Sequence, residues 1–136
     1  ALPIYASLWL KRLAALLLLG AAACGSSEMA ADCMSMPRSC AAGTTCWPTD
    51  MAGAFQCLAS KPYAPLGTEC AILVGLTTCA DSLICAPMTG QNGAKTNRCT
   101  QYCDDGASCP TGATCTPITL FAGSPEIPVC ILPPPT

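Results

Sequence analysis

The stretch CAAGTTCWP, residues 40–48, contains the pattern that decides the fold, and the chain repeats that pattern twice more. The second copy is CADSLICAP at residues 79–87, and the third is CPTGATCTP at residues 109–117. In each copy five residues separate two cysteines, a Gly or Ser stands three residues before the second cysteine, and a Pro stands two residues after it. These repeated coincidences indicate three homologous modules.

One cysteine before each repeat and one after it complete three groups of four, so the modules span residues 33–57, 70–99 and 103–130. A turn-rich segment follows the repeated Pro in every module, and a short run then ends on the last cysteine. Asn92-Gly93 is the strongest hairpin signal, because both residues tolerate the positive φ that a type I′ turn needs. The pattern predicts a small disulfide-rich fold of three tandem mini-modules, built from short β-hairpins and loops, with almost no helix after the leader.

Disulfide bonds are expected to hold these modules together, because large apolar side chains are scarce. Ordering each residue of a small domain costs about 1.5 kcal/mol, and a core this thin does not offset that cost. All thirteen cysteines lie at or after position 24. The aromatic residues beyond that position are Trp47, Phe55, Tyr63, Tyr102 and Phe121.

Four cysteines in a module allow three pairings, and sequence alone does not choose between them. We favour first with third and second with fourth, because a bond between the second and third would close only the tight inner loop and constrain the unfolded chain least. Each favoured bridge closes a loop of roughly 12 to 21 residues and contributes on the order of 3 kcal/mol. The favoured bridges are Cys33–Cys46, Cys40–Cys57, Cys70–Cys85, Cys79–Cys99, Cys103–Cys115 and Cys109–Cys130.

The chain begins with a leader that has the layout of an export signal. Two basic residues precede the apolar run LAALLLLGAAA at residues 13–23, and Cys24 follows it. A helix that spans a membrane needs about 20 apolar residues, so this shorter run predicts a signal peptide over residues 1–23 that is removed on export to an oxidising compartment. Residues 24–32, CGSSEMAAD, then predict a loosely extended tether.

Cys24 has two interpretations. The sequence LLGAAAC resembles the lipobox of bacterial lipoproteins, in which the cysteine is acylated at the new N-terminus, although Ala21 stands where Leu is usual. Ordinary signal-peptidase cleavage at the same bond also fits, because Ala21 and Ala23 satisfy the A-x-A pattern. Six bridges would use twelve of the thirteen cysteines, which favours lipidation of Cys24 over an exposed thiol.

Composition argues against several classes of function. Without the leader, four basic residues face eight acidic ones for a net charge of −4, which does not suit a nucleic-acid partner. The chain has no His, the usual base for a Ser or Cys nucleophile. Only Cys99 and Cys103 have the close spacing of a zinc knuckle, and they straddle a module boundary. We therefore expect a protein that is not an enzyme, with no catalytic residue, no metal and no cofactor, and we interpret Asp104-Asp105-Gly106 as a turn.

The segments that join the modules differ in length. Twelve residues, 58–69, separate the first module from the second, whereas residues 100–102 alone separate the second from the third. We expect modules two and three to form a stiff pair and module one to be hinged. The tail ILPPPT, residues 131–136, predicts an extended and exposed segment.

Two features are candidates for a contact surface. The run AILVGL at residues 71–76 is the most apolar stretch of the exported chain and includes Ile72, Leu73 and Val74. Such a run more often packs against a neighbouring module than contacts a partner. Trp47 either covers a disulfide or forms an exposed contact anchor, and packing is favoured.

The spacing over residues 33–130 resembles that of Cys-rich bacterial surface lipoproteins built of short C-x5-C modules. CDDGASCPTGATC, residues 103–115, is similar to EGF-like modules in spacing only. The resemblance implies a non-enzymatic adhesion or interaction protein, held to the membrane by an N-terminal lipid and facing an unknown protein or surface partner. Gly25 after the lipidated cysteine implies the outer membrane or cell surface. The alternative is a secreted soluble inhibitor of a protease, with Lys95 or Arg98 as its specificity residue.

Overall fold

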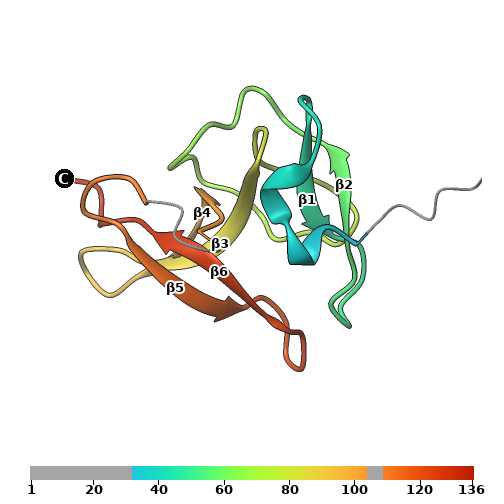
Figure 1. Cartoon of the computed structure of the whole chain (residues 1–136). Coiled ribbons are helices and arrows are strands. Elements are labelled where there is room, and N and C mark those ends of the chain that lie inside the picture. Colours follow the sequence, from blue (N-terminus) through green and yellow to red (C-terminus); the bar gives the residue numbers. More distant parts are fainter. Residues whose placement is uncertain (1–31, 104–108) are drawn as a thin grey trace, which may run out of the picture.

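The computed structural model describes residues 32–103 and 109–136 (Figure 1). The predicted signal over residues 1–23, Cys24 and the predicted turn at residues 104–106 lie outside the described residues. None of the helices in the described part of the chain is long and apolar enough to cross a membrane.

Six short strands form three separate two-stranded antiparallel sheets, one in each repeat (Figure 1). Two turns of 3-10 helix precede them, and together these elements make up the predicted disulfide-rich fold of small hairpins with very little helix. The elements are η1 (Cys33–Ser35), η2 (Pro37–Ser39), β1 (Thr44–Pro48), β2 (Phe55–Ala59), β3 (Leu83–Thr89), β4 (Lys95–Gln101), β5 (Thr114–Thr119) and β6 (Glu126–Ile131).

Two crossed disulfides clamp each hairpin to the segment before it. The third and fourth cysteines of a module face each other across the ladder, as Cys46 faces Cys57 between β1 and β2. They do not bond to each other. Each instead forms a disulfide with a cysteine that precedes the hairpin: Cys46 with Cys33, and Cys57 with Cys40. The other modules repeat this arrangement, which is the pairing favoured above. The bridges in the second and third modules are Cys70–Cys85, Cys79–Cys99, Cys103–Cys115 and Cys109–Cys130.

The small residue of each repeat marks a backbone position with positive φ. Gly43, Ser82 and Gly112 have φ of 82°, 59° and 83°, and Ser82 is the one non-glycine residue with positive φ in the described ranges. The next residue of each module donates its N–H to the carbonyl three residues back, at 3.0 or 3.1 Å. This turn sends the chain into the first strand of each hairpin, and side chains with a Cβ atom adopt its left-handed conformation only at a cost.

The repeated Pro stands where its missing N–H leaves the ladder intact. Thr49 N–H donates to the Ala54 carbonyl at 2.8 Å just beyond the ladder of the first module. Antiparallel pairs alternate between bonded and non-bonded, so the next pair, Pro48 opposite Phe55, needs no N–H from Pro48. The Pro of the other two modules occupies the same place relative to the paired cysteines.

The turn at Asn92-Gly93 differs from the predicted type I′ turn. Gly93 has a φ of 72°, but Asn92 does not have the positive φ that this turn type also requires. Gly90 N–H donates to the Ala94 carbonyl at 2.7 Å, and Gly93 N–H donates to the Gly90 carbonyl at 3.0 Å. The loop is therefore longer than a two-residue turn, and only its last glycine enters the left-handed region.

The prediction of a hinged first module is wrong, because backbone hydrogen bonds fasten the twelve-residue segment to module two. Lys61 N–H donates to the Cys79 carbonyl at 2.8 Å, and Ala80 N–H donates to the Ala64 carbonyl at 2.9 Å. Residues 67–70 then run along the free edge of β4 and exchange backbone hydrogen bonds with it. The length of a linker alone does not predict its mobility, because it does not show whether the linker backbone forms hydrogen bonds with a neighbouring module.

Tyr102 connects all three modules. It follows β4 directly, because the predicted linker at residues 100–102 mostly continues that strand. The side chain of Tyr102 is fully buried, and its hydroxyl donates to the Cys46 carbonyl in the first module at 2.8 Å. Its backbone forms a bridge to Val129 in the third module. At the other end of that module, the tail at residues 131–136 begins partly buried against the core and becomes exposed from residue 133 onward.

Replacing Ser82 with Gly is expected to raise the free energy of unfolding by up to about 1 kcal/mol, because Gly relieves the left-handed strain and loses only part of that gain through its freer unfolded chain. Gly43→Ala is the matched control of opposite sign: a Cβ there meets nothing within 4 Å, so its cost of about 1 kcal/mol is purely conformational. Chemical denaturation measures both. A destabilised S82G protein would contradict this account.

Candidate functional site

The apolar loop, residues 71–76, is held to the first module by its backbone, whereas several of its side chains face solvent. Trp47 Nε1 donates to the Leu73 carbonyl at 2.6 Å, and Gly75 N–H donates to the Pro48 carbonyl at 2.8 Å. Leu73 and Leu76 form a bridge across a tight turn. The exposed fractions of Leu73, Val74 and Leu76 are 42%, 41% and 53%. The loop therefore packs on a module, as expected, and still presents apolar side chains to solvent; its contact with a partner stays a prediction.

Two residues of the predicted contact surface lie elsewhere. Trp47 is fully buried, because its ring packs in the core while its indole N–H holds the loop, so it is not a contact anchor. Ile72 is half-buried and packs against the core. Leu73 and Val74 are the predicted contact residues that remain accessible.

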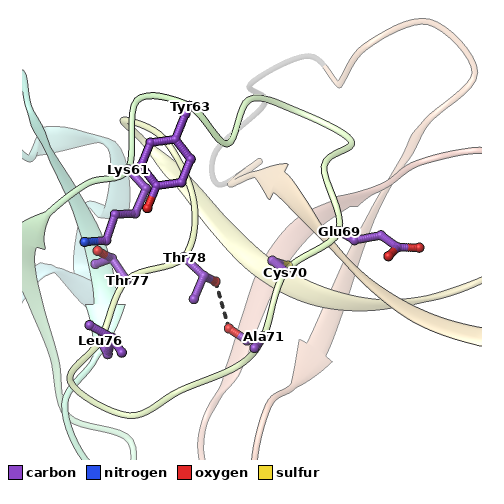
Figure 2. Close-up of a pocket in the computed structure, with 8 residues that line it drawn as sticks. All are labelled: Lys61, Tyr63, Glu69, Cys70, Ala71, Leu76, Thr77 and Thr78. Carbon is purple, nitrogen blue, oxygen red and sulfur yellow. Dashed lines mark hydrogen bonds between the residues drawn. The ribbon is translucent and has the colours of Figure 1, made fainter.

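A groove of about 550 Å³ opens beside the apolar loop (Figure 2). The segment between the first two modules supplies Lys61 and the strongly exposed Tyr63. The returning end of the apolar loop supplies Leu76, and Glu69 lies at the far end of the groove in Figure 2. The groove is lined by Lys61, Tyr63, Glu69, Cys70, Ala71, Leu76, Thr77 and Thr78.

Hydrogen bonds fix both walls of the groove. The Thr78 hydroxyl donates to the Ala71 carbonyl at 2.8 Å and so closes the base of the apolar loop (Figure 2). The buried Thr77 hydroxyl donates to the Ala59 carbonyl at the end of β2. A groove whose walls are tied to two modules offers a preformed surface, which lowers the entropy that a partner must offset on binding.

Asp81 joins three segments next to the groove. Its carboxylate accepts hydrogen bonds from the Ser60 hydroxyl and from the Gly43 N–H at 2.6 Å. The Ser60 hydroxyl first, and then the Gly43 N–H, hold the pKa of Asp81 below its ordinary value of 3.8. The carboxylate thus positions Ser60, the residue that leads into the groove at Lys61.

The cysteine sulfurs gather in groups that could be mistaken for metal centres. In each module three sulfurs lie within 4.8 Å of one another, for example those of Cys33, Cys40 and Cys46. Every one of them is bonded in a disulfide, so none is a thiolate ligand. The groups are the crossed bridges themselves.

The two residues named for an inhibitor lie in β4. Lys95 is exposed at its first position, next to the hairpin loop. Arg98 is half-buried, and its backbone lies between Ala86 of β3 and Glu69 on the opposite edge. Both edges of the Arg98 backbone are thus already paired, so the backbone at Arg98 is not free to pair with a protease, and the inhibitor role stays a prediction.

Sequence reasoning missed Tyr63, Lys61 and Leu76 as parts of the groove. The sequence KPYAP at residues 61–65 carried a usable signal, because Lys and Pro are residue types that mostly lie at the surface. Leu76 belonged to the apolar run, but the run alone does not tell that Leu76 is exposed while Ile72 is half-buried. That difference depends on the turn at Gly75.

Comparisons with known proteins identify no relative. No protein-family model matches the chain, and no curated protein and no solved structure shows significant similarity to it.

Replacing Asp81 with Asn is expected to lower the stability of the protein near neutral pH and to matter progressively less in acid. The folded-state pKa of Asp81 lies below its unfolded value, so the stabilisation by the carboxylate is complete above the unfolded value and is lost as the pH falls through the folded pKa. Melting temperatures of wild type and D81N over an acid pH series measure this. A difference that stays constant across the series would contradict it.

Proposed function

We propose that this chain is a non-enzymatic, exported lipoprotein that presents rigid disulfide-stapled modules for adhesion or protein interaction at the cell envelope. The leader directs export, Cys24 carries the lipid, and the groove is the contact surface. The proposal places the protein at the outer membrane or cell surface.

The pairing of the cysteines is the observation that carries this proposal. All twelve cysteines in the described residues bond to one another within their own modules. The thirteenth is Cys24, directly after the apolar run of the leader. An unpaired thiol in an oxidising compartment is a reactive liability, whereas an acylated cysteine has no such chemistry. The odd count therefore supports lipidation.

The build of the groove supports a binding role. Its walls are fixed by one hydrogen bond within the second module and one to the end of β2, and Tyr63 is 78% exposed at its edge. Exposed tyrosines suit interfaces because they combine an apolar ring with a polar tip and lose little entropy when they bind. Lys61 and Glu69 add one charge of each sign, which can fix the orientation of a partner.

The mass of the mature protein from its native host tests the anchor. We expect a chain that begins at Cys24, carries acyl groups and lacks the twelve hydrogens of six disulfides. Cys24→Ser is expected to move most of the protein from the membrane to the soluble fraction without changing its melting temperature. An unmodified Cys24 in the mature protein from the native host would refute lipid anchoring.

A photo-cross-linking amino acid at position 63 tests the groove in intact cells. We expect a specific adduct from position 63, and we expect Lys61→Glu to weaken it by reversing the charge beside the ring. Position 36 is the matched control, because Met36 is also strongly exposed, at 63%, and lies outside the groove. Equal labelling at both positions, or none at position 63, would contradict the proposal.

A further inference from the structure

The tip of the apolar loop has no role in the groove. Leu73 and Val74 point to solvent next to the glycine turn, and neither lines the groove. The loop contains no charged and no polar side chain over residues 71–76. An exposed run of this kind carries a cost in water unless something covers it.

We propose that this tip inserts into the surface of the lipid bilayer that carries the anchor, so that the protein touches the membrane at two points. The inference rests on the proposed function, because the lipid at Cys24 brings the folded modules to the bilayer. The second membrane contact adds an orientation, because two contacts fix the direction in which the groove faces relative to the membrane.

The place where the anchoring segment ends is the first argument for a bilayer. Nine residues run from Cys24 to Asp32, and a chain of that length reaches at most about 30 Å. The next residue, Cys33, is bonded to Cys46 with their Cα atoms 5.8 Å apart. Cys46 is followed by Trp47, whose indole holds the apolar loop. The segment from the lipid therefore enters the fold at Cys33, which is linked to the exposed tip through the Cys33–Cys46 disulfide and the hydrogen bond from Trp47 to Leu73.

The fixed backbone of the loop is the second argument. Insertion into a bilayer is costly for peptide groups that lack hydrogen-bond partners. Here the Leu73 carbonyl accepts from Trp47 at 2.6 Å, and the Gly75 N–H donates to Pro48 at 2.8 Å. The loop can thus bring Leu73 and Val74 into an apolar phase while these backbone groups keep their protein partners.

The surrounding side chains fit the zone between water and lipid. Tyr63 and Lys61 both line the groove that Leu76 joins to the tip, and an exposed tyrosine and a lysine with a long apolar stem are typical of membrane interfaces. Glu69 lies at the opposite end of the groove. Because the exported chain is acidic overall, we expect insertion to depend on apolar contact and to change little with salt.

Fluorescence quenching tests the proposal on C24S, the exported chain without its lipid. Trp47 is its only tryptophan after signal removal and is fully buried, so it is shielded from a quencher in the bilayer. Val74→Trp adds a reporter at the tip. We expect vesicles of brominated phosphatidylcholine to quench V74W much more strongly than the parent protein, in which Trp47 lies under the loop without contacting lipid. Gln91→Trp, at the exposed tip of the β3–β4 loop, is the matched control, and its added tryptophan is expected to stay unquenched.

A second variant removes the tip without adding an aromatic ring. Leu73→Ser with Val74→Ser in C24S is expected to lower binding to phosphatidylcholine vesicles by about tenfold, while the melting temperature changes little. Absence of V74W quenching, equal quenching of Q91W, or unchanged vesicle binding of the double variant would overturn the proposal. A blue shift of V74W that rises with protein concentration and needs no lipid would also overturn it, in favour of a second copy of the chain. These outcomes are independent of lipidation, which the mass of the mature protein decides separately.

Discussion

The crossed pair of disulfides in each module is the constraint on which the rest of the structure depends. A two-stranded hairpin alone is marginally stable in water. Here each strand is bonded to the segment that precedes the hairpin, as Cys46 is to Cys33 and Cys57 is to Cys40. Because the two bridges cross, neither strand separates from its partner without carrying the preceding segment along. Three such clamps allow hairpins with little apolar mass to form a folded protein.

Single polar contacts then convert three clamped hairpins into one body. The Tyr102 hydroxyl reaches the Cys46 carbonyl, the Trp47 indole reaches the Leu73 carbonyl, and the buried Thr100 hydroxyl reaches the Cys130 carbonyl. Each joins a side chain of one module or linker to the backbone of another part of the chain. The accepting carbonyls belong to cysteines or to a loop beside them, so the positions of these contacts depend on the bridges. The groove and the apolar loop lie where the first two modules are joined in this way.

The repeated residues predicted the hairpins well because each has a local task. The cysteine spacing sets the clamp, the Gly or Ser occupies a position with positive φ, and the Pro stands where no N–H is required. What the sequence did not predict depends on contacts between distant segments. Residues 58–69 looked like a free linker, but they pair with module two. The favoured packing of Trp47 is confirmed, but its hydrogen bond to the Leu73 carbonyl, 26 residues away, was not predictable from the local sequence. Tyr63 was missed because the groove that it lines forms only when residues 61–63 and 69–78 come together in the folded chain.

An N-terminal lipid and an apolar tip on the folded modules would hold this protein close to a membrane, with the groove at a defined orientation. That picture stands on the pairing of the cysteines. A bridge to Cys24 would leave another cysteine unpaired and remove the reason for a lipid at Cys24, and a different connectivity within the first two modules would change the position of the tip. Proteolysis of the unreduced mature protein, followed by mass spectrometry of the linked peptides, tests this pairing most directly. The account predicts six bridges, each first to third or second to fourth within a module, and none to Cys24. A bridge between modules, or any bridge to Cys24, would contradict it.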